Sequence, residues 1–257
     1  NRKMARVLEE IARAVFTSWF VDFDPVRRRL LSGPTLALAL PESLAALFPN
    51  RLVNSPLGEV PEGWRVLRFN AFARPSTDRV GTQLVPTYSS TNTGLRPRSE
   101  TYKKTLSASD SKNLIVRRGD LVFGLSRAIL NFGLMTDDVG SVSAVYKVFS
   151  IDTSVVAPAY VESYMRARPG FFKRVLNSSS REGQSVSSQQ VLATELLIPP
   201  PSVRHCFEAI TGAIITGIGA RQSEAATLAA LRDTLLPKLI SGELRIADAE
   251  RIVGRAV

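Results

Sequence analysis

The chain has 257 residues, 44% of them hydrophobic, which is enough for one large or two small domains with a buried core. Cys206 is the only cysteine and His205 the only histidine, which excludes a disulfide framework, a thiolate metal cluster and a His-rich zinc site. No apolar run reaches the length of a membrane span and no secretory leader is visible, so we expect a cytoplasmic protein without a metal or other cofactor.

The formal net charge of +10 is concentrated in one part of the chain. Residues 64–131 contain 12 Lys/Arg and 4 Asp/Glu, whereas the stretches before and after this block are close to neutral. A basic block between neutral flanks favours a nucleic-acid surface. The alternative is a solvated basic face that binds nothing.

The N-terminal pattern predicts an amphipathic helix that ends near Phe20, so residues 1–21 form one unit. Asp22 and Asp24 follow it. Because no third ligand or general base is placed near them, we interpret them as a stop signal rather than a catalytic pair. Residues 22–63 are predicted to be a linker with a short helix at 42–47 and a turn-rich segment leading to a buried Trp64.

Residues 64–200 predict one mixed α/β domain, with short strands, short helices and polar loops. The expected strands cover residues 65–69, 84–88, 114–116, 121–125, 142–149 and 194–198. The expected helical segments cover residues 159–167, 171–176 and 188–192. Arg117-Arg118-Gly119-Asp120 is predicted to form a tight turn between two strands.

The loops of this domain combine cationic, amide and hydroxyl side chains, which contact phosphates and base edges in DNA complexes. The candidates for DNA contact are Arg96, Arg98, Lys103, Lys104, Arg127, Asn131, Arg181 and Gln184. Arg127 is the preferred single candidate, because it lies at the end of an expected strand inside the basic block. A solvated surface position is the alternative for each of them.

A triple proline precedes a long predicted helix from Val203 to about Ile240, with Ser202 as its N-cap and Gly242 suited to its C-terminal cap. At 1.5 Å per residue this helix would be roughly 55 Å long, which is typical of a spacer with a coiled-coil seam. Shifting the N-terminal segment by 220 positions aligns its apolar residues with those of the long helix, as a weak internal repeat. Residues 201–242 are therefore one unit, followed by a tail at 243–257.

Several stretches, taken together in order and spacing, are similar to the specificity subunit of Type I restriction–modification systems. They are Phe16-Thr17-Ser18-Trp19-Phe20-Val21-Asp22-Phe23-Asp24-Pro25-Val26, Leu47-Phe48-Pro49, residues 55–64, Gly119-Asp120-Leu121, Leu197-Ile198-Pro199-Pro200-Pro201 and Leu235-Leu236-Pro237-Lys238-Leu239-Ile240-Ser241-Gly242. The first and last stretches are the most specific. The chain departs from the family in having one recognition domain, and in placing Arg204-His205 where a Glu-Gln pair is usual.

The resemblance implies an α+β fold in which a mixed α/β target-recognition domain, here the second of the family's two, sits beside long antiparallel helices. It also implies a non-catalytic subunit that reads one half of a split site in double-stranded DNA. Modification (methyltransferase) subunits would dock on the helical regions, and the restriction subunit would join through that complex.

Antiparallel pairing adds one expectation about the helices. A 20-residue helix covers about 30 Å, so the far part of the long helix is left without a mate. Its apolar stripe is expected to bind a second copy of the chain, a missing half or a modification subunit. The stripe comprises Leu228, Leu231, Leu235 and Leu239.

Two other functions remain open. The chain could be a scaffold whose basic face is incidental, in which case salt-sensitive DNA binding is absent. It could also be a nuclease using Asp137-Asp138 or Asp120, in which case the isolated chain cleaves DNA with a metal.

Overall fold

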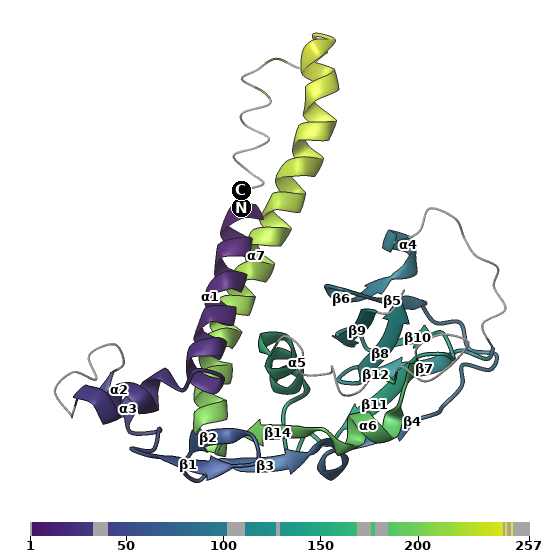
Figure 1. Ribbon diagram of the computed structural model, residues 1–257. Helices are drawn as coiled ribbons and strands as arrows, with labels where there is room; N and C mark the ends of the chain where they lie inside the picture. The colour runs from purple at the N-terminus through teal and green to yellow at the C-terminus, as the bar shows by residue number, and fades with distance from the viewer. Residues whose placement is uncertain are drawn as a thin grey trace.

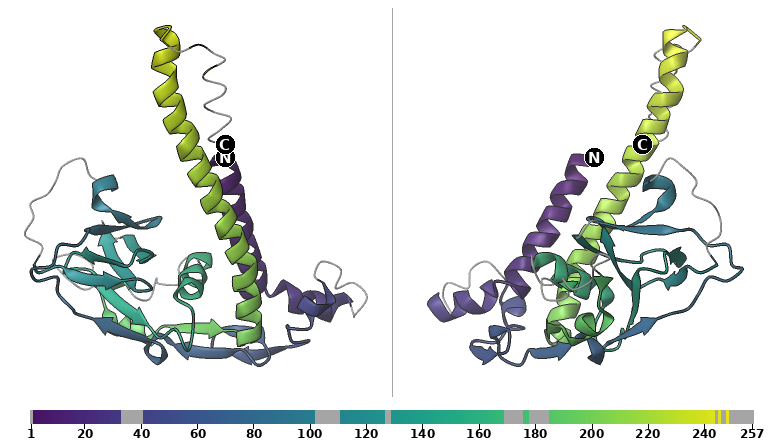
Figure 2. Two further views of the ribbon diagram at one scale, coloured as in Figure 1. Left: turned by 180° about the vertical axis from the view of Figure 1, so that it is seen from behind. Right: turned by 45° about the vertical axis from the view of Figure 1, so that its right-hand side comes forward.

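A helical rod and a strand-rich region make up the computed structural model (Figure 1). The structure describes residues 2–32, 41–101, 111–126, 129–168, 176–177 and 185–243, together with residues 245 and 248. The rod consists of α1 (Arg2–Phe20) and α7 (Pro201–Ile240). The two helices run antiparallel, as predicted, and α7 continues well beyond the N-terminal end of α1 (Figures 1 and 2).

Aromatic side chains hold the base of the rod together. Phe207 of α7 lies 5.4 Å from Phe16 and 5.0 Å from Phe20 of α1, measured between ring centroids. Trp19 packs edge-on against Phe48 at 5.1 Å. The side chains of Phe16, Trp19, Phe20 and Phe207 are all buried. Burial of such large side chains is the main source of stability in a core.

The ends of α7 correct one prediction and confirm another. Pro200, not Ser202, is the N-cap residue, and no side chain caps the first turn. Proline suits the start of a helix because the first N–H groups have no partner within the helix. At the other end, Gly242 adopts a φ of 75° and its N–H donates to Leu239 O, as expected of a C-terminal glycine. Pro237 lies inside the last turn, and the helix continues to Ile240.

The segment predicted as a linker contains more regular structure than expected. It forms α2 (Asp24–Ser32), α3 (Glu42–Ala45) and a hairpin of β1 (Leu52–Ser55) with β2 (Gly58–Pro61). Asp24 begins α2 and accepts a hydrogen bond from Ser18 Oγ at 2.8 Å, which supports the structural interpretation of this aspartate. Trp64 is buried at 6% exposure, as predicted, and packs against Phe23.

A four-stranded antiparallel sheet in the order β4-β11-β8-β9 forms the centre of the strand-rich region. Its strands are β4 (Ala73–Ser76), β11 (Lys147–Ile151), β8 (Leu121–Ser126) and β9 (Ile129–Leu134). Four two-stranded pairs surround it: β3 (Arg65–Arg68) with β14 (Glu195–Ile198), β5 (Tyr88–Thr91) with β6 (Gly94–Pro97), β7 (Leu114–Arg117) with β10 (Val139–Val142), and β12 (Leu176–Asn177) with β13 (Ser185–Val186). Short helical segments complete the region: η1 (Phe69–Ala71), α4 (Arg98–Thr101), α5 (Pro158–Ala167) and α6 (Ser188–Ala193).

Two strand predictions were wrong. Leu84 is fully exposed and the strand begins at Tyr88, where pairing with Pro97 opens the β5–β6 hairpin. The alternating segment at 142–149 is interrupted by a turn at 143–146 in which Tyr146 N–H donates to Ser143 O, so only Val142 belongs to β10 and residues 147–149 to β11. The other strands and the helices at 159–167 and 188–192 are confirmed within two residues. The predicted segment at 171–176 lies almost wholly outside the described residues.

One hydrophobic core connects the rod to the sheet. It contains Phe16 and Phe20 of α1, Val203 and Phe207 of α7, Tyr160 and Tyr164 of α5, and Phe123 and Phe149 of the sheet. A smaller cluster around Val116, Val122 and Met135 fills the space under β7 and β10. The α+β class predicted from the sequence is confirmed, and no helix among the described residues is long and apolar enough to cross a membrane.

Candidate nucleic-acid interface

The β5–β6 hairpin carries Arg96, the most exposed of the three predicted DNA-contacting residues that the structure describes. Thr91 and Gly94 close its turn, where Thr91 Oγ1 donates to Gly94 O at 2.8 Å and accepts from Thr93 N–H at 3.2 Å. Gly94 has a φ of 121°, a conformation that other residues rarely adopt. Arg96 follows on β6 and is exposed, and its guanidinium has no hydrogen-bond or ion-pair partner in the part of the chain that the structure describes. The hairpin therefore presents a cation with its hydrogen-bonding capacity unused.

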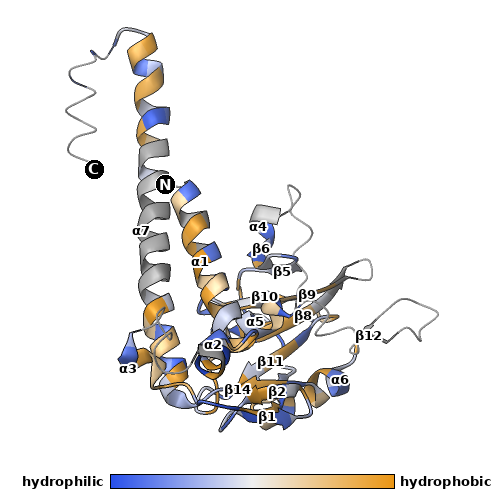
Figure 3. Ribbon diagram, turned by 60° about the vertical axis from the view of Figure 1, so that its left-hand side comes forward, coloured by the Kyte–Doolittle hydropathy of each residue, from blue (hydrophilic) through white to orange (hydrophobic). Residues whose placement is uncertain are grey.

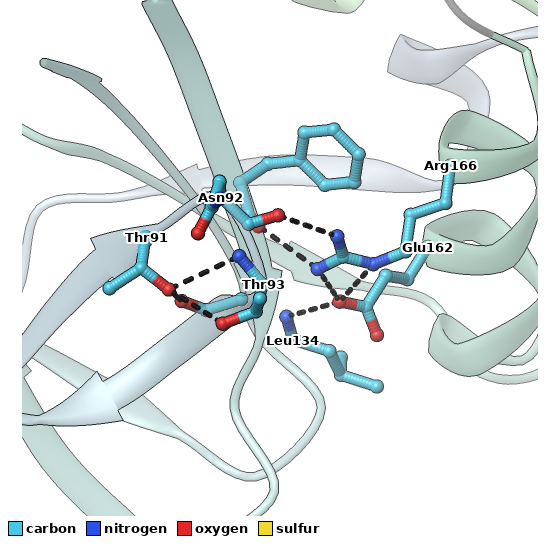
Figure 4. Close-up of polar contacts among 8 residues, drawn as sticks. Thr91, Asn92, Thr93, Leu134, Glu162 and Arg166 are labelled. Carbon is cyan, nitrogen blue, oxygen red and sulfur yellow. Dashed lines mark hydrogen bonds and ion pairs between the residues drawn. The ribbon is translucent and has the colours of Figure 1, made fainter. Parts of the chain in front are cut away.

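Arg166 of α5 fastens this hairpin to the sheet (Figure 4). Its guanidinium donates to Asn92 O at 3.4 Å and to Phe132 O at 3.2 Å, and it lies over the Phe132 ring at 4.8 Å. Glu162, one helical turn earlier, pairs with Arg166 at 2.7 Å and accepts from Leu134 N–H at 3.3 Å. The planar guanidinium can hold several acceptors at once, so this pair orders the hairpin turn relative to β9.

Sequence reasoning missed both members of this pair. The only local signal is a Glu and an Arg at positions i and i+4 of a predicted helix, a spacing that usually marks a surface pair. Their actual partners are backbone carbonyl and N–H groups far away in the sequence.

Backbone contact also seats the hairpin. A Cβ atom at Gly133 of β9 would lie 2.4 Å from the backbone nitrogen of Leu95 and 2.8 Å from the carbonyl carbon of Gly94. The two backbones therefore approach more closely at this point than any residue with a side chain permits. The position of Arg96 is thus set by β9 as well as by α5.

The other predicted DNA-contacting residues are either less exposed than Arg96 or lie outside the described residues. Arg98 is half-buried at the start of α4. Asn131 lies on β9 opposite Gly124 of β8 and is only 8% exposed, so most of its side chain is covered. The remaining candidates lie outside the described residues: Lys103, Lys104, Arg127, Arg181 and Gln184. All eight assignments stay predictions.

Part of the basic block is neutralised by neighbouring carboxylates. Arg117 pairs with Asp78 at 2.9 Å and Arg118 with Asp138 at 2.8 Å. These exposed pairs each contribute little to stability, but they lower the charge available to a phosphate near them. Among the described residues Arg96 has no such carboxylate partner, and neither do Arg65, Arg74 and Arg79, but of these four only Arg96 was predicted to contact DNA.

The carboxylates proposed for a nuclease have structural roles. Burial raises the pKa of the Asp120 carboxyl, which also accepts a hydrogen bond from Arg117 N–H at 2.8 Å within the predicted Arg-Arg-Gly-Asp turn. Asp137 accepts a hydrogen bond from the Tyr88 hydroxyl, and Asp138 pairs with Arg118. In the described part of the chain, no three His, Cys, Asp or Glu residues are grouped as a metal site requires.

At the far end of α7 the exposed apolar residues differ in part from the predicted stripe. Leu231 and Leu239 are half-buried and Leu235 is 8% exposed, while the side chain of Leu228 lies outside the described residues. The most exposed apolar side chains there are Leu236 at 51% and Ile240 at 79%. Apolar and charged positions alternate along this end of the helix (Figure 3). The stripe stays a prediction, to which the structure adds these two residues.

Comparison with known proteins gives a match along nearly the whole chain. No family model matches the chain. It is 22% identical over 262 aligned positions to the Type I restriction enzyme MjaIX specificity subunit of Methanocaldococcus jannaschii. The alignment covers 96% of this chain and 55% of that protein. The chain therefore spans about half the length of this curated relative.

Two solved structures are also similar. One is the HsdS subunit of Thermoanaerobacter tengcongensis, with 14% identity, a TM-score of 0.41, and coverage of 95% of this chain and 57% of that one. The other comes from a study of complex assembly and conformational transition in a Type I restriction–modification system, with 14% identity, a TM-score of 0.43, and coverage of 91% and 56%. The resemblance predicted from the motifs is confirmed by the curated match: along 96% of its length, this chain is related to the specificity subunit of a Type I restriction enzyme.

Proposed function

We propose that the chain is a DNA-recognition part of a Type I restriction–modification complex, reads one half of a bipartite site, and acts in the cytoplasm without catalysing a reaction. The relationship to a specificity subunit along 96% of the chain is the observation that carries this proposal. Methylation and cleavage would then reside in the modification and restriction subunits that assemble with it.

The proposed division of labour follows the units of the chain. Residues 1–21 and 201–242 form the spacer, residues 22–63 connect it to the recognition domain at 64–200, and residues 243–257 are a tail. The basic block at 64–131 supplies affinity through phosphate contacts that release counterions. A few side chains on base edges supply sequence discrimination, and the rod sets the spacing to the other half-site.

Arg96 is the residue on which base recognition is tested first. We expect Arg96→Ala to relax the preference at one or two base pairs by about 1–3 kcal/mol, because a guanidinium can bind guanine bidentately in the major groove. Duplexes bound from a random pool, by the chain with its modification subunit, would be sequenced for wild type and variant. Arg118→Ala is the matched control, since it removes the same charge from the same block but from an arginine paired with Asp138.

The outcomes of this selection separate the rival functions. A wild-type complex that enriches no sequence would contradict the proposed function, as the scaffold alternative requires. Enrichment that is identical for wild type and Arg96→Ala would leave DNA recognition in place and remove Arg96 from it. Metal-dependent cleavage by the isolated chain would support the nuclease alternative instead.

The far end of α7 is the proposed docking site for another protein of the complex. We expect Ile240→Asp to weaken association with a modification subunit by about 10- to 100-fold, because burial of an isoleucine side chain contributes about 1.5–3 kcal/mol. Sedimentation of mixtures measures this, and sedimentation of the chain alone detects a second copy as the alternative occupant. Val145→Asp, at a residue 76% exposed in the 143–146 turn, is the control. Equal association for both variants would refute docking at this end.

A further inference from the structure

A cleft of about 480 Å³ lies between the base of the rod and the recognition region. Its walls come from α1, α5, α7 and the turn of the β5–β6 hairpin. In Figure 1, α5 lies between the rod and the strands, and residues of all four elements line the cleft. The cleft is thus the place at which the spacer and the candidate DNA-reading hairpin share a surface.

The charged side chains that line the cleft leave a net charge of +2. They are Arg13, Arg96, Arg166, Arg204, Glu162 and Glu208. Arg166 and Glu162 neutralise each other at 2.7 Å, so three arginines face one remaining carboxylate, that of Glu208. Such an excess of cations in a concave surface attracts anions.

Two of these arginines come from the rod and retain unused donors. Arg13 of α1 is exposed, and its guanidinium has neither an ion pair nor a hydrogen bond in the described part of the chain. Arg204 of α7 donates from Nη1 to Val155 O at 2.8 Å, whereas its Nε is buried without a hydrogen-bond partner among the described residues. A buried donor without an acceptor is unfavourable by about 1–3 kcal/mol, which an anion oxygen in the cleft would offset.

We propose that this cleft binds a phosphodiester of the duplex DNA, so that the rod contacts the DNA backbone at its base in addition to acting as a spacer. The proposal rests on the proposed function and deepens it. Arg96 connects the two, because it lines the cleft and is also the candidate base-reading residue. The major groove is about 12 Å wide and about 8.5 Å deep, so the phosphates of the nearer strand lie on the order of 10 Å from a base edge that Arg96 reaches.

An acidic segment of a partner protein has the same chemistry as a ligand, but the geometry favours DNA. A protein segment in the cleft would occupy the space next to Arg96 and compete with base recognition by the hairpin. A phosphate strand in the cleft is, in contrast, compatible with the hairpin contacting bases. Phosphate contacts of this kind also fix the register of a protein on its duplex, which base contacts alone do not.

The test is the salt dependence of DNA binding by the complex, measured by fluorescence anisotropy on a selected duplex. We expect Arg13→Gln to lower the slope of log K against log [salt] by about 0.9, the value for one lost phosphate contact, and Arg13→Lys to restore it. Arg28→Gln is the matched control, because it makes the same chemical change at an exposed arginine of α2 that lies outside the rod and does not line the cleft, and its slope should equal that of wild type.

Duplexes with single neutral methylphosphonates identify the phosphate. At one position the substitution should weaken binding by wild type but not by Arg13→Gln, as a double-mutant cycle requires for two groups that interact. Inorganic phosphate at millimolar concentration should change the difference in DNA affinity between wild type and Arg13→Gln no more than an inert salt of equal ionic strength does. The reason is that the proposed ligand is a phosphodiester held by the duplex.

Three results would overturn the inference. Equal slopes for wild type and Arg13→Gln would mean that no phosphate is bound there. A loss of modification-subunit association with an unchanged slope would assign the cleft to a protein. A wild-type complex without sequence preference would refute the proposed function, and the inference with it. If the wild-type complex shows a sequence preference but its salt slope equals that of Arg13→Gln, the inference about the cleft is refuted and the proposed function is not.

Discussion

Phe20→Ala is expected to destabilise the folded chain by about 3–5 kcal/mol, the usual consequence of truncating a fully buried aromatic residue. Phe20 has no exposed surface, and its ring lies 5.0 Å from Phe207, 5.3 Å from Tyr160 and 5.8 Å from Trp64. These partners belong to the other rod helix, to α5 and to the start of the strand-rich region. Because one ring connects three parts of the chain, its removal should loosen the rod from the strand-rich region as well as open a cavity.

Urea denaturation followed by circular dichroism measures this effect. The expected loss is a large share of the roughly 5–15 kcal/mol by which domains are stable. Met4→Ala is the control on the same helix, since Met4 is 52% exposed and its truncation should change stability by no more than about 0.5 kcal/mol. A loss below 1 kcal/mol for Phe20→Ala would contradict a core shared between rod and sheet.

Gly133→Ala is expected to displace the β5–β6 hairpin and to remove sequence discrimination on DNA. The new Cβ would lie 2.4 Å from Leu95 N, and both nearest neighbours are backbone atoms, which cannot rotate away as a side chain can. Overpacking of this kind destabilises by about 1–3 kcal/mol and by more where the backbone must move. Since Arg96 is on the displaced strand, binding to the selected duplex should fall to the level of random DNA.

Gly212→Ala makes the comparison strict, because it is the same chemical change at a helical position where, among the described residues beyond the adjacent helix backbone, no atom lies within 4 Å of the new Cβ. It should stabilise α7 by up to about 1 kcal/mol and leave DNA selectivity unchanged. Measuring both variants by denaturation and by anisotropy on selected and random duplexes separates a local displacement from general unfolding. Wild-type selectivity in Gly133→Ala would mean that the hairpin does not depend on β9 for its position.

Local sequence patterns were sufficient for much of the secondary structure. The apolar spacing of α1 and α7 predicted both helices, since an amphipathic stripe must pack against another element. Their antiparallel arrangement was implied by the family resemblance. Gly119 adopts a φ of 90° in the predicted turn, and β8 and β14 lie within one residue of the bounds predicted for them. The relationship to Type I specificity subunits was also evident from short motifs, because these combine residue identity with order along the chain.

The hairpin of β5 with β6 shows what these patterns could not predict. Its polar sequence, with hydroxyls and glycine, is typical of a loop, and it becomes a pair of strands because β9 and α5 supply its partners. Ser89 and Ser90 are buried there despite their polarity. Context of this kind overrides intrinsic strand propensity, which mainly reflects packing against neighbours.

The amino-acid sequence by itself determined the long helices, their apolar seam, the position of the basic block and the family relationship, because each depends on residues near one another in the chain. Only the tertiary structure decided that the Arg96 side chain is exposed on the β5–β6 hairpin and which residues hold that hairpin in position. Arg166 reaches Asn92 across 74 positions, Gly133 admits the backbone of Leu95, and the cleft unites Arg13, Arg96 and Arg204 from three distant segments. Contacts between residues so far apart depend on how the whole chain packs, and no local spacing encodes that packing.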